Sequence, residues 1–201
     1  MKIILASSNK GKIKEIQKLL PQYEVLPYSD ILGSIDIEET GSTFKENSII
    51  KAVTVNTLLK DKLKNNSYII ISDDSGITVP ALNNEPNIYS ARYAGENATD
   101  EDNLNQLISN LNKKNISKTA AHYTACLTII LNDAVYTVHG WMYGEVINKA
   151  IGSNGFGYDP IFIPTNFDKT LGELDDSLKK EISHRSKALN LALKIINSIT
   201  K

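Results

Sequence analysis

Short apolar runs separated by polar stretches organise the first half of the chain. Residues 2–6 and 68–71 are continuous apolar runs of the kind found in strands buried on both faces. Between them, residues 13–20 place apolar side chains at helical spacing until a proline ends the pattern, and a further strand is expected at 23–26. A long helix is predicted from about residue 44 to residue 62. This order of strand, helix and strand predicts a sheet that begins with parallel strands.

The second half of the chain favours antiparallel strands. Residues 120–131 and 134–140 are apolar runs around a two-residue Asn-Asp turn, which predicts a β-hairpin, and another strand is expected at 142–148. Thr99 is placed to cap one helix, and a C-terminal helix begins near His184. Together the two halves predict an α/β fold in which a long, mixed, twisted sheet is flanked by helices.

The overall composition is that of an ordinary globular protein. The chain has 201 residues, 41% hydrophobic and 22% charged, with a net charge of −1. This length suits one domain over residues 1–201, built as two lobes around a cleft. Near-neutral charge argues against a general polyanion binder, so no nucleic-acid polymer is expected as a partner.

The single cysteine and the hydropathy pattern indicate the expected location. Cys126 excludes an intrachain disulfide and lies in an apolar run, so we expect it in the core. The N-terminus has too short an apolar region for a signal peptide, and no apolar stretch approaches the ~20 residues that span a bilayer. We therefore expect a cytoplasmic protein without membrane association.

An acidic pair follows the apolar run at 68–71. Ser72-Asp73-Asp74-Ser75-Gly76 places two carboxylates at what we expect to be the end of a strand, where open α/β sheets bind ligands. Because strand side chains alternate, Asp73 and Asp74 are expected on opposite faces. One of them, most simply Asp74, would hold a metal ion or position a water molecule.

Three other stretches suggest ligand binding. Residues 7–12 link a strand to a helix N-terminus, which can meet an anion, although they do not form a Walker A motif. Residues 152–160 contain three glycines with Phe156 and Tyr158, which could stack on a flat ring. His184 and Arg185 lie in a first helical turn, where the helix dipole disfavours cations, so an anionic or carbonyl-bearing ligand would explain them.

Each feature also has a plain structural explanation. Loops such as 7–12 are common, and residues 152–160 could form a hairpin loop plugged by its aromatics. Lys51 could be a solvated helix lysine. Capping explains the acidic residues 100–102, and Thr43 with Glu46 resembles a capping box.

Taken together, the motifs describe a nucleoside triphosphate site without a P-loop. Carboxylates at 38–39 and 73–74 suit Mg²⁺, which takes one or two protein carboxylates plus substrate phosphates. The chain resembles the inosine/xanthosine triphosphate pyrophosphatase (ITPase) family. The resemblance rests on seven segments in the family's order: Ala6–Lys12, Glu39–Asn47, Lys51-Ala52, Asp73–Gly76, Tyr89–Gly95, Gly155–Pro160 and Ser183–Arg185.

The resemblance implies a two-lobed mixed-sheet α/β fold and a homodimer. It also implies Mg²⁺-dependent hydrolysis of ITP, dITP and XTP to the monophosphate and pyrophosphate, which cleanses the nucleotide pool. Asp74 would be the catalytic base, and Glu39 and Asp74 the metal ligands. The substrate-binding residues would be Ser7, Ser8, Asn9, Lys10, Gly11, Lys12, Lys51, Ser75, Arg92, Phe156, Gly157, Tyr158, Asp159, Lys179, His184 and Arg185.

The chain departs from the family pattern in small ways. Asn84 and Asn87 replace glycines that are frequent in the family, and Lys180 competes with Lys179 for one position. Two alternatives stay open. One is a Maf-like nucleotide pyrophosphatase that acts on pyrimidine or modified nucleotides, and the other is a non-catalytic nucleotide sensor.

Overall fold

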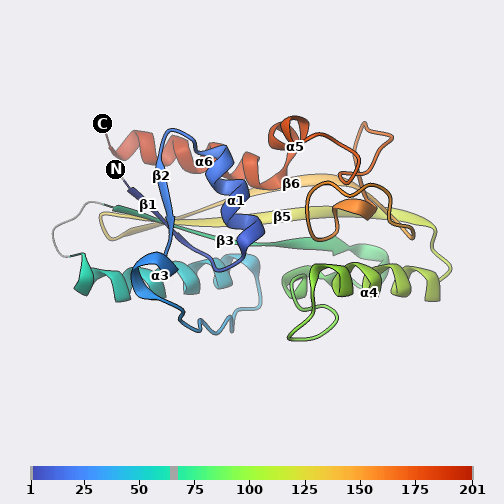
Figure 1. Ribbon diagram of the computed structural model, residues 1–201, viewed down its shortest axis with the longest axis horizontal. Helices are drawn as coiled ribbons and strands as arrows, with labels where there is room; N and C mark the ends of the chain where they lie inside the picture. The colour runs from blue at the N-terminus through green and yellow to red at the C-terminus, as the bar shows by residue number, and fades with distance from the viewer. Residues whose placement is uncertain (1, 64–67, 201) are drawn as a thin grey trace. The chain divides into compact units, whose positions relative to one another are not determined.

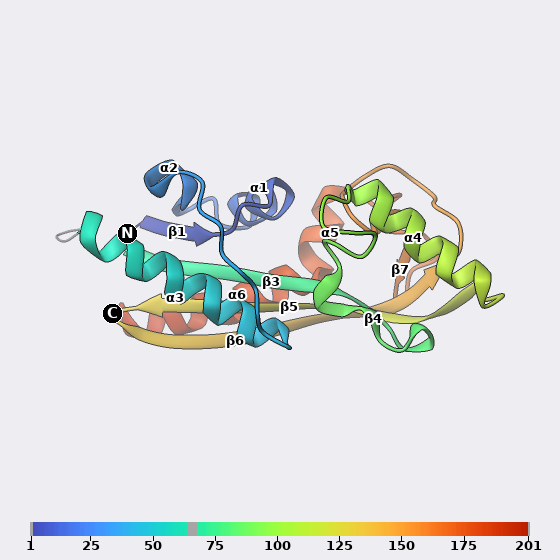
Figure 2. The same cartoon turned by 90° about the horizontal axis from the view of Figure 1, so that it is seen from below.

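The computed structural model describes residues 2–63 and 68–200. Within them, seven strands form one mixed sheet in the order β2-β1-β3-β5-β6-β7, with β4 paired to β3, and helices flank it (Figures 1 and 2). The strands are β1 (Lys2–Ala6), β2 (Glu24–Pro27), β3 (Tyr68–Val79), β4 (Glu85–Pro86), β5 (Lys118–Leu131), β6 (Ala134–Ile147) and β7 (Phe162–Pro164). The α-helices are α1 (Lys10–Leu19), α2 (Ser29–Leu32), α3 (Phe44–Lys62), α4 (Asp100–Lys113), α5 (Asp176–Ile182) and α6 (His184–Ile199). Short 3₁₀ turns are η1 (Pro80–Leu82), η2 (Asn87–Tyr89) and η3 (Asp159–Ile161). The predicted α/β class is confirmed.

The directions of the strands agree with the sequence pattern. β1 pairs in parallel with β2 and β3, whereas β3–β4 and β6–β7 are antiparallel. The predicted hairpin joins β5 to β6. Its turn residues Asn132 and Asp133 both have positive φ, 50° and 64°, as a two-residue hairpin turn requires.

Three features of the secondary structure were not predicted. β3 continues for 12 residues through Asp73-Asp74-Ser75-Gly76, so the acidic pair lies inside a strand and not at its end. Its parallel pairing with β1 stops at Ala6↔Ser72, so the acidic pair follows the point where β1 ends. β6 is one strand where two were expected, and the short helices α2 and α5 had no clear signal in the sequence.

The chain divides into two compact units. Unit 1 contains the described residues of 1–74, 125–140 and 187–201, and unit 2 contains residues 75–124 and 141–186. A cleft between two lobes stays a prediction. In the described part of the chain, no helix combines the length and apolar character needed to cross a membrane.

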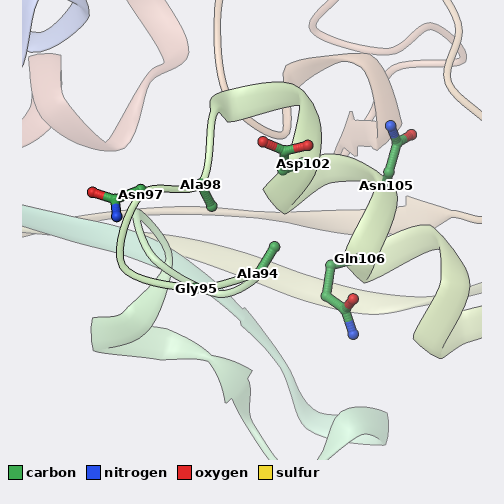
Figure 3. Close-up of a pocket in the computed structure, with 7 residues that line it drawn as sticks. All are labelled: Ala94, Gly95, Asn97, Ala98, Asp102, Asn105 and Gln106. Atoms are coloured by element: carbon green, nitrogen blue, oxygen red, sulfur yellow. The ribbon is translucent and has the colours of Figure 1, made fainter.

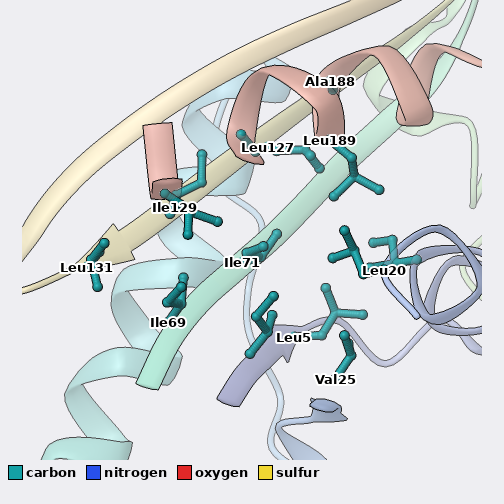
Figure 4. Close-up of a cluster of buried hydrophobic side chains, with 14 of the residues drawn as sticks. Leu5, Leu20, Val25, Ile69, Ile71, Leu127, Ile129, Leu131, Ala188 and Leu189 are labelled. Atoms are coloured by element: carbon teal, nitrogen blue, oxygen red, sulfur yellow. The ribbon is translucent and has the colours of Figure 1, made fainter. Parts of the chain in front are cut away.

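Unit 1 buries its strands on both faces. Ile69 and Ile71 of β3 belong to one apolar cluster with Leu189 of α6 (Figure 4). Ile70 belongs to a second cluster with Val55 of α3. Figure 1 shows α3 on one side of these strands and α1 and α6 on the other. The even and odd positions of β3 therefore face different helices, which decides where its polar residues point.

Unit 2 has a single apolar cluster in which Leu107 and Leu111 of α4 pack with Ile77 and Phe162. Thr99 caps α4 through a complete capping box with Asp102. This contact confirms the capping explanation for Asp102.

We predict that the two asparagines at family glycine positions are tolerated because both adopt left-handed backbone. Asn84 is exposed with φ 66°, and Asn87 has φ 53°. Asparagine accepts this conformation more readily than other non-glycine residues. Asn84→Ala should lower the free energy of unfolding by about 1 kcal/mol, whereas Asn84→Gly should leave it nearly unchanged.

Urea denaturation of both variants measures this difference. Asn190→Ala, at an exposed position of α6, is the matched control and should not destabilise the protein. Equal losses for Asn84→Ala and Asn84→Gly would contradict the assignment.

Candidate active site

The alternation of β3 separates the two adjacent carboxylates. Asp73, at an odd position, lies toward α1, where its Oδ2 is 3.2 Å from Lys12 Nζ. Asp74, at an even position, lies toward α3, where its Oδ1 accepts a 2.8 Å hydrogen bond from Lys51 Nζ. The prediction that the pair points to opposite faces is confirmed.

Lys51 joins two carboxylates from different parts of unit 1. Its Nζ donates to Asp74 and, at 2.9 Å, to Glu39 Oε1. The Lys51 side chain is only 11% exposed, so the alternative of a solvated lysine is wrong. Burial lowers the pKa of Lys51, but Asp74 and Glu39 together outweigh burial and raise it. Lys51 therefore stays charged at neutral pH.

Asp74 lies in an excess of negative charge. Burial raises its pKa most, and Lys51 and Lys12 oppose that rise without cancelling it, while Glu39 adds to it. One ammonium cannot neutralise two carboxylates, so the cluster of Glu39, Lys51 and Asp74 has a net charge of −1. Within the described residues, Asp74 Oδ2 is buried and has no hydrogen-bond partner. The cluster thus offers an unused acceptor and an attraction for a cation.

These residues fit a hard divalent cation. Among residues 2–63 and 68–200, no group of three or more His, Cys, Asp or Glu side chains is placed to hold a metal on its own. Glu39 and Asp74 provide two carboxylates, and Mg²⁺ commonly completes such a pair with water and substrate phosphate oxygens. The donor set therefore suits Mg²⁺ bound together with a phosphorylated substrate.

The loop between β1 and α1 is built to present backbone N–H groups. Asn9 is the N-cap of α1, and its side chain accepts a hydrogen bond from Lys12 N at 3.0 Å. Ser7 Oγ accepts from Asn9 N at 3.3 Å, while Ser8 and Lys10 are exposed. The first-turn N–H groups of a helix have no intrahelical acceptor and attract anions.

In unit 2, an aromatic ring lies among cations. Phe156 has Lys179 Nζ 5.0 Å and Arg185 Cζ 5.9 Å from its ring centroid. The carboxylate of Asp159 accepts from Phe156 N at 2.9 Å and from Lys179 Nζ. Gly155 has φ 81°, and a Cβ there would lie 2.0 Å from Asp159 Oδ2, so only glycine fits. Asp159 thus orients both the loop and the Lys179 side chain. Lys180, the other candidate for this position, is exposed.

The first turn of α6 is also buried. Arg185 is 2% exposed, and its Nη2 donates to Ser75 Oγ at 2.8 Å. The His184 ring stacks on Tyr123, with centroids 4.7 Å apart and planes 11° from parallel. Tyr123 was not predicted as a site residue. Its strand pattern indicated burial, but only the fold shows that it faces His184.

Three predicted binding residues have other contacts. Tyr158 is 5% exposed within the apolar cluster of unit 2 and donates to Ser90 O at 2.7 Å, so its ring does not offer the stacking surface that we expected. Gly157 N donates to Asp100 Oδ2 at 3.3 Å. The Arg92 guanidinium lies 5.2 Å from the Tyr89 ring centroid. The binding roles of these residues stay predictions.

A separate surface hollow lies beside the start of α4 (Figure 3). It has a volume of about 530 Å³. Its lining consists of Ala94, Gly95, Asn97, Ala98, Asp102, Asn105 and Gln106. None of the predicted site residues is among them, and Asp102 is already engaged in capping. We therefore do not assign the chemistry to this hollow.

Comparisons with known proteins show the family of the chain. The model of the Ham1 family matches residues 3–195. A relative from Aliarcobacter butzleri named dITP/XTP pyrophosphatase is 59% identical over 199 residues, covering 99% of this chain and 100% of the relative. A Sulfurovum sp. protein of the same name is 54% identical, covering 99% and 95%.

Solved structures show the same fold. The Staphylococcus aureus Ham1 protein has a TM-score of 0.82 and 39% identity, with coverage of 98% of this chain and 99% of that one. A HAM1 protein from Coxiella burnetii also has a TM-score of 0.82, with 37% identity and the same coverage. The resemblance found in the sequence is thereby confirmed.

We predict that Lys51→Met destabilises the protein in a pH-dependent way. Removing the ammonium leaves two mostly buried carboxylates together, which should cost about 3 kcal/mol at pH 7.5. Without Lys51 the native pKa of Asp74 rises further, so the folded state binds more protons than the unfolded chain in acid. Stability then falls as pH rises through this range, and the deficit should shrink toward pH 4.5.

Urea denaturation of wild type and variant at both pH values tests this. Lys45→Met, at an exposed position of the same helix, should change stability by less than about 0.5 kcal/mol. A Lys51→Met deficit that is the same at pH 4.5 and pH 7.5 would refute the carboxylate explanation.

Proposed function

Because this chain belongs to the Ham1 family, we propose that it hydrolyses non-canonical purine nucleoside triphosphates (ITP, dITP and XTP) to the monophosphate and pyrophosphate. Relatives named dITP/XTP pyrophosphatase, similar over nearly the whole chain, support the substrate class. The structural observation that carries the proposal is the buried cluster of Glu39, Lys51 and Asp74, with its excess negative charge and unused carboxylate oxygen.

We assign the phosphates to unit 1. The loop residues Ser7, Ser8, Asn9, Lys10, Gly11 and Lys12 supply hydroxyl, backbone N–H and ammonium donors at the start of α1. Asp73 supports this loop, since its carboxylate forms a salt bridge with the Lys12 ammonium. Lys51 holds the neighbouring carboxylates through two hydrogen bonds, and we propose that it contacts a phosphate as well.

Glu39 and Asp74 are the proposed ligands for Mg²⁺. When bound, Mg²⁺ would neutralise phosphate charge and lower the pKa of a coordinated water. We also propose that the protein is a homodimer, as the family resemblance implies.

The proposed reaction is attack of water on the α-phosphorus. The new bond joins the water oxygen to phosphorus, the bond to the bridging oxygen of the β-phosphate breaks, and pyrophosphate leaves. Asp74 accepts the proton of the attacking water. Asp74 is buried in the cluster, and a positioned carboxylate can take this proton as a general base.

We assign base recognition to Phe156, Lys179, His184 and Arg185 of unit 2. Phe156 offers a ring, and the cations beside it can reach carbonyl oxygens of the base. The carbonyl at the 6-position is shared with guanine, so it cannot by itself reject GTP. Exclusion of the guanine 2-amino group must come from shape or from donors left unpaired, a mechanism that can discriminate by roughly 10⁴-fold.

We predict that pyrophosphate release is confined to the non-canonical purines. A panel of dITP, XTP, dATP, dGTP, dUTP and dTTP, each with and without Mg²⁺, should give release mainly from dITP and XTP and only with the metal. Release mainly from pyrimidine nucleotides would favour the Maf-like alternative. Tight binding without release would favour the sensor.

Arg185→Ala, measured with the same panel of nucleotides, tests whether Arg185 recognises the purine base. It should reduce the ratio of kcat/KM for dITP over dATP by at least about 10-fold, because adenine lacks the carbonyl at the 6-position. Because Arg185 is buried, circular dichroism must first show that the variant folds, and Arg185→Lys provides a smaller change. Equal fractional losses for every triphosphate would contradict the assignment.

We predict that Asp74→Asn lowers kcat for dITP by about 10²–10⁴-fold, because the base and a metal ligand are lost together. Asp36→Asn, at an exposed loop position, is the matched control and should keep full activity. Steady-state kinetics on folded protein decide the question. A near-normal kcat for Asp74→Asn would remove Asp74 from the mechanism.

A further inference from the structure

The proposed metal ligand Glu39 lies in a stretch that has little structure of its own. Residues 33–43, between α2 and α3, contain neither helix nor strand. Glu39 is partly exposed, and its carboxylate contacts Lys51 Nζ. A bound cation would compete with the Lys51 ammonium for that carboxylate, so another contact must fix the backbone around Glu39.

Three side chains fasten this stretch to the first turns of α3. Thr43 Oγ1 accepts from Glu46 N at 3.1 Å. Glu46 Oε2 accepts from Ser42 N at 2.7 Å and from Ser42 Oγ at 2.8 Å, so the expected capping box is displaced by one residue. Both contacts are exposed. The third is Asn47 Oδ1, which accepts from Gly41 N at 2.8 Å and belongs to a fully buried side chain.

The contact between Gly41 and Asn47 is the closest to Glu39. A Cβ on Gly41 would lie 2.6 Å from Asn47 Oδ1 and 2.6 Å from Glu46 Cβ, so the loop backbone lies directly against the helix. Gly41 is two residues from Glu39. This fit leaves the backbone beside Glu39 little room to move.

Stability alone does not explain an amide at position 47. Within the described residues, Asn47 Nδ2 is buried and has no hydrogen-bond partner. A buried donor without an acceptor costs more than one ordinary hydrogen bond returns, and the partly exposed Gly41 N–H can bond to water instead. An apolar side chain of similar shape should therefore cost the fold little. The amide is better explained by the position that it gives to the loop.

We propose that Asn47 is a positioning residue, which holds Glu39 in place for the divalent cation through the N–H group of Gly41. Lys51 lies one turn further along α3 and holds the Glu39 carboxylate. Asn47 holds the backbone, and this contact does not compete with the cation. The inference rests on the proposed role of Glu39 as a metal ligand.

Direct binding of Mn²⁺ to the full chain, measured by electron paramagnetic resonance, tests the proposal. Asn47→Leu should weaken Mn²⁺ binding by about 10-fold or more, as loss of a contact that orients a ligand typically does. The Mg²⁺ concentration for half-maximal activity should rise by the same factor, with little change in kcat at saturating Mg²⁺. The midpoint of urea unfolding should stay close to that of the wild type.

Thr43→Ala is the matched control, because it removes a cap from the same helix without touching Gly41. It should lower the unfolding midpoint and leave Mn²⁺ affinity unchanged. Gly41→Ala disturbs the same contact from the loop, because its Cβ would lie 2.6 Å from Asn47 Oδ1, and it should weaken Mn²⁺ binding as well. If both variants act through one contact, their effects combined in the double variant should be clearly less than additive.

The possible failures are distinguishable. Wild-type affinity in Asn47→Leu, or an equal loss in Thr43→Ala, would overturn the role of Asn47 and leave the proposed function intact. A wild-type protein that binds no Mn²⁺ and hydrolyses dITP without metal would refute the metal site itself, and the role of Asn47 with it.

Discussion

The polar part of unit 1 depends on one electrostatic constraint: a single buried ammonium faces two carboxylates. Lys51 bonds to Glu39 and Asp74 at 2.9 and 2.8 Å, in surroundings where an unpaired charge would be costly. The ammonium is sufficient to hold both carboxylates in the fold but insufficient to neutralise them. The fold therefore holds both acidic side chains in place, and the same imbalance is the reason for proposing a divalent cation at this cluster.

The strand that carries Asp74 makes this possible. The apolar residues Ile69, Ile70 and Ile71 are buried on both faces and fix β3 between α3 on one side and α1 and α6 on the other. Alternation then sends Asp73 to Lys12 and Asp74 to Lys51, so each of two adjacent acidic residues meets its own lysine. A shift of one residue in β3 would exchange the faces and bury both charges against the wrong helices.

Much of the fold could be predicted from local patterns, and what was missed depended on distant contacts. The start of α3 was indicated by the capping signal of Thr43 and Glu46, and the β5–β6 hairpin by a two-residue turn, which are local signals. β3 was predicted to end too early, because Asp-Asp-Ser-Gly has the composition of a turn but is buried within a strand that lies between β1 and β5 in the sheet. A solvated Lys51 stayed an open alternative, because its partners lie 12 and 23 residues away. Tyr158 looked like a stacking ring, because its contact with Ser90, 68 residues away, is invisible in the sequence. The full set of proposed site residues came from the family resemblance, since no spacing pattern in the sequence singles out Glu39, Asp74 and Arg185.

The same strand carries a residue proposed for the chemistry and, next to it, a residue that contacts Arg185. Asp74 and Ser75 are consecutive residues of β3, so their Cα atoms are about 3.8 Å apart and their side chains leave opposite faces. Asp74 is held by Lys51, and Ser75 accepts a hydrogen bond from Arg185, which lies beside Phe156. In the proposed function, the residue that takes the proton and the residue that holds Arg185 are therefore neighbours in one strand, so the positions of both depend on the packing that keeps β3 extended.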